Sequence, residues 1–236
     1  MTYVPSIWCV VPAAGVGRRF GSQTPKQYLK INQRTVMEHS INRLLQLQQI
    51  AGLVVAISEE DHHHKALHFS YSDKVHFTLG GEERCHSVLH GLQYLSAIAD
   101  ANDWVLVHDV ARPCVRPDDV AKLLEQVSQF DACGGILATP VRDTMKRSDH
   151  LNNIVDTVER DRLWHALTPQ VFRLGQLKTA LQQALDDGFM VTDEASAMEH
   201  AGEKPILVEG HGDNLKITHP QDLELAALFI TQQEES

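Results

Sequence analysis

The sequence predicts an α/β fold with a mostly parallel sheet that helices cover on both faces. Short apolar runs rich in β-branched residues alternate with segments whose apolar residues recur at helical spacing. The first apolar run stops at a proline followed by small residues and glycines. A length of 236 residues with 43% hydrophobic content suffices for a sizeable core. We therefore expect one domain spanning residues 1–236.

The elements follow one another in a strand-then-helix order. The predicted strands cover Ile7–Val11, Leu53–Ile57, Val75–Leu79, Trp104–His108 and Gly135–Ala138. Apolar stripes at helical spacing lie between or after them: Met37, Ile41, Leu44 and Leu45; Val88, Leu89, Leu92 and Leu95; Val120, Leu123, Leu124 and Val127. Ligands of such sheets collect at the carboxyl ends of the strands, so the residues just after each strand are the first candidates for chemistry.

The last part of the chain returns to helix and strand. Leu174 to Asp187 and Glu194 to Ala201 are predicted as helices, Ile206–Val208 as a strand, and the segment from about Pro220 as a final helix. Thr192-Asp193-Glu194 is typical of a helix start.

Composition excludes several classes of protein. The formal net charge of −10 argues against a general nucleic-acid binder, whose phosphate contacts need a basic face. No apolar run approaches the length of a membrane span, and the N-terminus lacks a signal-peptide pattern, so we expect a cytoplasmic protein without a membrane partner. The four cysteines are scattered and are expected to be free thiols.

The loop after the first strand has the composition of a phosphate-binding loop. Its small residues and glycines are followed closely by cations: Pro12, Ala13, Ala14, Gly15, Gly17, Arg18, Arg19 and Lys26. Glycine allows the backbone amides to approach an oxyanion, and the cations add full charge beside them. A nucleoside triphosphate is the expected guest.

Two better-known phosphate loops do not fit this stretch. A Walker loop needs a lysine directly after its last glycine, whereas Ser22 follows Gly21. The dinucleotide fingerprint needs a third glycine where Phe20 stands. A hydride-transfer enzyme is therefore disfavoured.

Further candidates follow the later strands. In the segment from Gly80 to Ser87, two glycines precede a predicted helix. The first backbone amides of that helix can donate hydrogen bonds to a ligand. Asp109 is well placed to hold Mg²⁺, although Arg112 offers it an ion pair instead. Asp213 and Lys216 supply a second candidate metal carboxylate and a second phosphate lysine. The His62–His64 run is interpreted as solvated surface, because consecutive residues do not face one site.

A charged hairpin interrupts the alternation between residues 140 and 163. Its predicted strands are Val141 to Arg147 and Ile154 to Arg160, joined by a polar turn. An isolated hairpin is only marginally stable in water, so it must pack on something. A second copy of the chain is the economical partner, which makes this segment a candidate dimerisation arm, while packing on its own domain is the alternative.

Six motifs in order resemble the 2-C-methyl-D-erythritol 4-phosphate cytidylyltransferase family over nearly the whole chain. They are Pro12 to Arg19 with Pro25 to Tyr28, Val107 to Pro113, Val141 to Thr144, Ala166 to Gln170, Thr192 to Ala195, and Asp213 to Lys216. Val110 stands where the family is expected to have alanine, and Glu82 where some members carry aspartate.

The resemblance implies a Rossmann-like, mostly parallel sheet of the nucleotidyltransferase type with a protruding β-hairpin arm that reaches across a homodimer. It implies transfer of the cytidylyl group of CTP to 2-C-methyl-D-erythritol 4-phosphate, which yields 4-diphosphocytidyl-2-C-methyl-D-erythritol and pyrophosphate for non-mevalonate isoprenoid synthesis. Mg²⁺ is the implied cofactor. Positioning and charge stabilisation carry most of such a reaction.

The resemblance also implies roles for individual residues. The catalytic set is Arg19, Lys26, Arg160 and Lys216. The nucleotide-binding set is Pro12, Ala13, Ala14, Gly15, Gly17, Arg19, Lys26, Gly81, Glu82 and Ser87. The set that binds the methylerythritol phosphate is Asp109, Arg112, Thr144, Arg160, Thr168, Thr192 and Lys216, with Thr144 and Arg160 serving the partner's site. The metal ligands are Asp109 and Asp213.

Alternatives from other classes stay open on the sequence. One is a cytidylyltransferase for another polyol phosphate, such as ribitol 5-phosphate. Another is a nucleotide-binding module without catalysis, and a dehydrogenase is a distant third.

Overall fold

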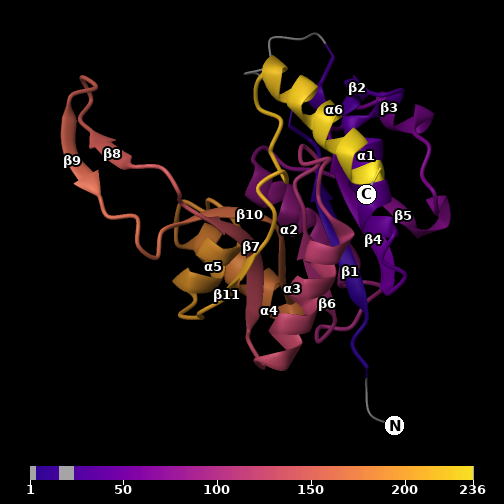
Figure 1. Ribbon diagram of the computed structural model, residues 1–236. Helices are drawn as coiled ribbons and strands as arrows, with labels where there is room; N and C mark the ends of the chain where they lie inside the picture. Colours follow the sequence, from indigo (N-terminus) through magenta and orange to yellow (C-terminus); the bar gives the residue numbers. More distant parts are fainter. Residues whose placement is uncertain (1–3, 16–23, 236) are drawn as a thin grey trace.

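A computed structural model describes residues 4–15 and 24–235 of the chain (Figure 1). Its centre is a seven-stranded sheet in the order β11-β7-β10-β6-β1-β4-β5. The strands are β1 (Ile7–Pro12), β4 (Ile50–Ile57), β5 (Val75–Leu79), β6 (Trp104–Val107), β7 (Gly134–Pro140), β10 (Trp164–Arg173) and β11 (Ile206–Glu209). Every strand expected from the apolar runs is present, β5 at the predicted bounds and the others at slightly different ones.

The sheet is mostly parallel, which confirms the predicted fold class. β1 pairs in parallel with β4 and β6, β4 with β5, and β7 with β11. Val10 at the centre of β1 lies opposite Val54 on one side and Val107 on the other. Strands buried on both faces are nearly continuous apolar runs, which is why these segments were recognisable in the sequence.

Strand β10 was missed by the sequence analysis, although it lies in the middle of the sheet. It runs antiparallel to both β6 and β7. Its register on β7 shifts between Ala166 and Gln170, so Thr168 and Pro169 lie at an irregularity rather than in a regular ladder. Proline is confined to edges and bulges of sheets, and here it breaks the apolar run that would have indicated a strand.

Helices cover both faces of the sheet, as predicted. They are α1 (Val36–Leu45), α2 (Arg84–Leu95), α3 (Pro117–Gln129), α4 (Leu174–Asp186), α5 (Glu194–His200) and α6 (Pro220–Glu234). α1 and α3 pack with Cys9 and Val11 on one face, whereas α2, α4 and α5 pack with Val10 on the other. The alternation along β1 is the period of two expected for a strand. No helix among the described residues is both long and apolar enough to cross a membrane.

A short two-stranded sheet and a capping box fix the start of α1. β2 (Lys30–Ile31) pairs with β3 (Arg34–Thr35) just before the helix. The Glu38 amide donates to Thr35 Oγ1 at 3.1 Å, and the Thr35 amide donates to Glu38 Oε2 at 2.7 Å. This reciprocal pair satisfies two amides that helix geometry leaves without partners. α6 packs beside this unit over Ile31 and Val36.

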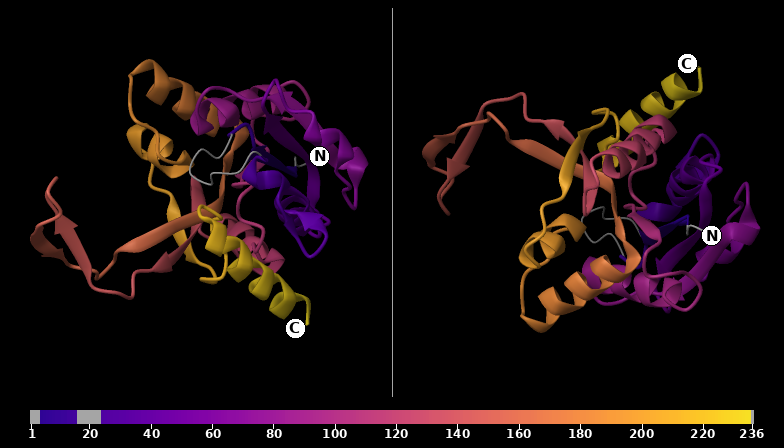
Figure 2. Two further views of the ribbon diagram at one scale, coloured as in Figure 1. Left: turned by 90° about the horizontal axis from the view of Figure 1, so that it is seen from above. Right: turned by 90° about the horizontal axis from the view of Figure 1, so that it is seen from below.

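The predicted hairpin is present and projects from the body of the molecule (Figures 1 and 2). β8 (Met145–Ser148) pairs antiparallel with β9 (Ile154–Val158). In the sequence both strands lie between β7 and β10, which are themselves neighbours in the main sheet. The paired part is shorter than expected. Leu151, Ile154 and Val155 are 69%, 68% and 62% exposed, so the arm carries apolar side chains that the single chain does not bury.

A buried histidine joins β6 to β10 behind the carboxyl end of β6. His108 Nε2 lies 3.1 Å from the Arg112 carbonyl, and Nδ1 lies 3.0 Å from Thr168 Oγ1. A carbonyl only accepts, so Nε2 carries the proton and Thr168 donates to Nδ1. Thr168 Oγ1 in turn accepts the Asp109 amide at 3.1 Å. Burial lowers the pKa of His108 to about 4, which keeps the ring neutral.

We predict that His108 makes the fold sensitive to acid. In the unfolded chain an ordinary histidine gains its proton near pH 6.5, whereas folded His108 gains it only near pH 4. As pH falls through this window the unfolded state binds the extra proton, so stability is lost. Between pH 7 and pH 4.5 the loss should be roughly 2–3 kcal/mol.

Urea unfolding across that pH range should show a steeper loss in the wild type than in His108→Gln. The exposed His62→Gln variant is the matched control and should follow the wild type. Equal slopes for wild type and His108→Gln would contradict the assignment.

Candidate active site

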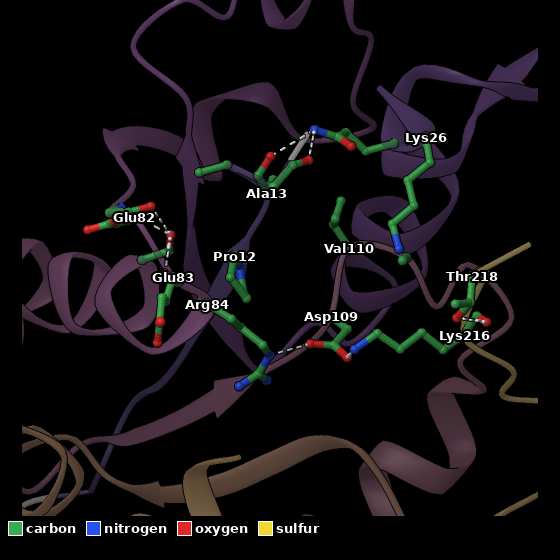
Figure 3. Close-up of a pocket in the computed structure, with 16 residues that line it drawn as sticks. Pro12, Ala13, Lys26, Glu82, Glu83, Arg84, Asp109, Val110, Lys216 and Thr218 are labelled. Carbon is green, nitrogen blue, oxygen red and sulfur yellow. Dashed lines mark hydrogen bonds and ion pairs between the residues drawn. The ribbon is translucent and has the colours of Figure 1, made fainter. Parts of the chain in front are cut away.

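The main cavity lies at the carboxyl end of the sheet and encloses about 610 Å³ (Figure 3). Segments that are distant in sequence form its wall: Pro12 to Gly15, Lys26 and Gln27, Gly81 to Arg84, Ser87, Asp109 to Ala111, Lys216 and Thr218. The structure therefore brings together the described part of the opening loop, the glycine turn before α2, Asp109 and Lys216. Gly17, Arg18 and Arg19 lie outside the described residues.

The described part of the opening loop is held by the turn that follows it. Lys26 begins a short 3₁₀ turn, Lys26–Tyr28, and Gln27 in this turn is buried. The Gln27 amide donates to the Ala13 carbonyl at 2.8 Å and to the Gly15 carbonyl at 3.3 Å. Gln27 belongs to one of the family motifs in the sequence, and its hydrogen bonds fix Lys26 beside the loop. Lys26 Nζ donates to the Ile217 carbonyl at 2.9 Å.

The glycine turn before α2 needs its glycines for close packing. A Cβ atom on Gly80 would lie 2.4 Å from Ala14 Cβ, so no larger residue allows this approach of the two loops. The Gly81 amide donates to Ser87 Oγ at 3.0 Å. Ser87 is buried in the first turns of α2 and ties the turn to the helix. Together the two loops form one wall of the cavity.

A network of charges forms the floor of the cavity. Arg84 Nε lies 2.7 Å from Asp109 Oδ1, and Lys216 Nζ lies 2.7 Å from Asp109 Oδ2 (Figure 3). On its other side Arg84 binds both carboxylate oxygens of Glu194, at 2.7 and 3.0 Å. Sequence reasoning missed Arg84 and assigned Glu194 only to a helix start. No local signal pairs them, because they lie 110 positions apart.

This network fixes the charge of Asp109. Burial by itself raises the pKa of the Asp109 carboxyl, but the charges of Arg84 and Lys216 outweigh it and hold the pKa well below its usual range. Burial likewise lowers the pKa of Arg84, and the charges of Glu194 and Asp109 more than reverse that effect. The cavity therefore presents an ionised carboxylate flanked by cations, with Lys26 as a further cation in the wall.

Only one of the two predicted metal carboxylates faces this cavity. Asp213 instead receives Arg116 Nη2 at 2.5 Å, Arg116 Nε at 3.0 Å and Gln233 Nε2 at 2.8 Å. The expected pairing of Asp213 with Asp109 is therefore not formed. Asp213 turns toward α3 and α6, whereas Lys216, three residues later, turns toward Asp109.

The remaining predicted residues divide into three groups. Arg112 and Thr168 are buried behind Asp109 and contact the groups around it rather than the cavity. Thr192 is exposed before α5, and its amide donates to Ser196 Oγ at 3.1 Å. Thr144 and Arg160 lie on the projecting hairpin segment, where Arg160 donates to the Arg142 carbonyl and lines a separate hollow of about 510 Å³. The single chain does not bring these two to the main cavity.

Asn214 also supports the site and was quoted only within a motif. The side-chain amide of Asn214 donates to the Thr168 carbonyl at 2.8 Å. The backbone carbonyl of Asn214 accepts a hydrogen bond from Arg112 Nη1 at 2.7 Å. Asn214 is buried, so these bonds hold the segment before Lys216 against β10. Lys216 is thereby directed at Asp109.

Comparison with known proteins places the chain in a family. Residues 7–232 match the family model described as "2-C-methyl-D-erythritol 4-phosphate cytidylyltransferase". A protein of that name from Serratia proteamaculans is 49% identical over 229 residues, covering 97% of this chain and 95% of the relative. One from Shewanella piezotolerans is 51% identical over 224 residues, covering 95% of each chain.

Solved structures agree with the sequence matches. A crystal structure of a 4-diphosphocytidyl-2C-methyl-D-erythritol synthase superposes with a TM-score of 0.83 at 37% identity, covering 97% of this chain and 100% of the other. The Francisella tularensis 2-C-methyl-D-erythritol 4-phosphate cytidylyltransferase gives a TM-score of 0.83 at 36% identity, covering 95% of this chain and 99% of the other. The chain belongs to the 2-C-methyl-D-erythritol 4-phosphate cytidylyltransferase family.

Proposed function

We propose that the protein transfers the cytidylyl group of CTP to 2-C-methyl-D-erythritol 4-phosphate. The products are 4-diphosphocytidyl-2-C-methyl-D-erythritol and pyrophosphate, in the non-mevalonate route to isoprenoid precursors. Family membership over almost the whole chain supports this reaction. The observation that carries it is the cavity in which Lys26 and Lys216 surround space beside a buried, ionised Asp109.

The reaction joins two anions, and the cavity is suited to that task. A phosphate oxygen of the methylerythritol phosphate attacks the α-phosphorus of CTP, a new P–O bond forms, and the bond to the β-phosphate breaks as pyrophosphate leaves. Charge grows on the transferring group, so fixed cations lower the barrier. Lys26 would stabilise the triphosphate, together with Arg19 from the undescribed part of the loop. Lys216 would leave Asp109 for the incoming phosphate.

A divalent cation fits beside Asp109. Mg²⁺ is bound in such sites by one or two carboxylates together with substrate phosphates. Asp109 is ionised, buried and part of the cavity wall, so one of its oxygens would hold the ion. When bound, the cation would neutralise charge on the phosphates. Asp213 is not included in this proposal, because it does not line the cavity and its carboxylate is turned toward Arg116 and Gln233.

The cytosine base of CTP and the methylerythritol phosphate would contact different walls of the cavity. Cytosine would contact Gly81, Glu82, Ser87 and the backbone from Pro12 to Ala14, where the close approach of Gly80 to Ala14 narrows the cavity against a purine. The methylerythritol phosphate would lie on the side of Lys216 and Thr192, with the buried Arg112 and Thr168 supporting that side from behind Asp109. Asp109 and Arg84, in the floor of the cavity, would lie between the cytosine region and the region of the methylerythritol phosphate.

A homodimer would complete the second substrate site. The arm exposes Leu151, Ile154 and Val155, and a hairpin of this size needs a packing partner. Insertion of the arm into a second copy would bury these side chains and bring Thr144 and Arg160 toward the partner's cavity. The two sites of the dimer would then each contain residues of both subunits.

The proposed activity predicts a specific pattern of pyrophosphate release. With Mg²⁺ present, CTP and 2-C-methyl-D-erythritol 4-phosphate should release pyrophosphate, and chelation of the metal should stop it. Replacing CTP by ATP, or the second substrate by ribitol 5-phosphate, should reduce the rate strongly. Faster turnover with ribitol 5-phosphate would identify the other cytidylyltransferase, and CTP binding without any release would identify a binding module.

Lys26→Ala should slow turnover on the order of 10²-fold or more, the scale expected for loss of one charge-stabilising group. Lys30→Ala is the matched control, since it removes an exposed lysine four positions later, and should stay near the wild-type rate. Steady-state kinetics of the purified variants decide the question. Near wild-type turnover of Lys26→Ala would refute its role.

Mixing inactive Lys26→Ala with inactive Arg160→Ala subunits should restore activity. One composite site of the mixed dimer would keep Lys26 from one subunit and Arg160 from the other. Subunit exchange is confirmed with two affinity tags before the assay. Absence of recovery in an exchanged sample would show that each site is built within one subunit.

A further inference from the structure

We propose that Glu83, Cys85 and His86 form a binding site for a thiophilic divalent cation such as Zn²⁺. They stand at the beginning of α2, outside the charge network of Asp109. Each offers one ligand atom, and these atoms all lie within 4.8 Å of one another. Thiolate, imidazole and carboxylate are the ligands that Zn²⁺ prefers, whereas Mg²⁺ prefers oxygen alone. The proposed site is therefore chemically distinct from the metal requirement of the reaction.

The distances suit a tetrahedral ion. Cys85 Sγ lies 3.7 Å from Glu83 Oε2. Bond lengths of about 2.3 Å to sulfur and about 2.0 Å to oxygen at a tetrahedral angle put these two atoms about 3.5 Å apart. The thiol and carboxylate are thus already near their spacing around an ion. Glu83 is exposed and makes no side-chain cap to the helix, and its carboxylate accepts the Cys85 thiol.

His86 supplies an independent observation. Its Nδ1 is buried and has no hydrogen-bond partner among the described residues. A buried ring nitrogen without a partner is costly, since it has lost water and gained nothing. The backbone of Gly81 packs against the base of this side chain, since a Cβ there would lie 2.3 Å from His86 Cβ. A metal ion bound to this nitrogen would replace the hydrogen bond to water that the nitrogen loses on burial.

The nearest cation in the sequence does not compete for the cluster. Arg84 directs its guanidinium to Asp109 (Figure 3) and, on its other side, to Glu194. Burial and the neighbouring Glu83 carboxylate raise the pKa of the Cys85 thiol, so the thiol would lose its proton when it binds the ion. With a thiolate and a carboxylate as ligands, the bound ion would be neutralised. A fourth position would stay open to water, because the described part of the chain supplies three ligands.

Cobalt binding tests the site without substrate. Co²⁺ takes the place of Zn²⁺ and gives a thiolate-to-metal charge-transfer absorption when cysteine is a ligand. Wild-type protein stripped with a chelator should bind one equivalent and show this band, and Zn²⁺ should displace it while Mg²⁺ should not. Because no turnover is measured, failure of the proposed activity would leave this readout intact.

Variants separate the cluster from other possible ligands. Cys85→Ser should remove the band and weaken Zn²⁺ binding by roughly 100-fold or more, since even residues that only support a ligand contribute 10- to 100-fold. His86→Gln should weaken binding as well, and it decides the case if Cys85→Ser does not fold. Cys133→Ser and the double variant His63→Gln, His64→Gln are matched controls and should keep the wild-type band. A wild type without the band, or unchanged Zn²⁺ binding in both Cys85→Ser and His86→Gln, would overturn the site.

Discussion

The buried carboxylate of Asp109 is the constraint around which the cavity is built. An uncompensated charge at this depth would be very costly, so the fold must bring cations to it. Arg84 comes from α2 and Lys216 from the segment between β11 and α6, each 2.7 Å from one carboxylate oxygen. Glu194 then binds Arg84 from α5. One carboxylate therefore links four distant parts of the chain.

The two cations on Asp109 differ in how firmly they are held. Arg84 bridges two carboxylates and is largely enclosed, whereas the side chain of Lys216 is 43% exposed. Under the proposed function, a substrate phosphate would attract Lys216 while Arg84 keeps Asp109 charged and in place. The charge network around Asp109 would thus stabilise the fold in the absence of substrate and contribute Lys216 to substrate binding in its presence. The proposed division of labour follows from exposure and from the number of partners.

The projecting arm is the part of the fold on which the proposed homodimer rests. Its apolar side chains are exposed, and the two residues implied in substrate binding lie on it, away from the cavity of their own chain. In the body of the molecule two apolar layers enclose the sheet, although single apolar side chains such as Met190 and Phe130 are exposed there too. The exposed side chains of the arm therefore support the proposed homodimer, and the charged residues of the cavity support the proposed reaction.

The sequence by itself determined the elements whose signal is local. Apolar runs located six of the seven sheet strands, helical stripes located the covering helices, and glycine turns located the cavity walls. Tertiary structure alone decided the rest. β10 is stabilised by its neighbours β6 and β7 despite Pro169, and Arg84 meets Glu194 only through the path of the chain. Asp213 and Lys216 are three residues apart yet turn to different partners. Periodicity is a property of neighbouring residues, whereas pairing of charges depends on which distant segments burial brings together.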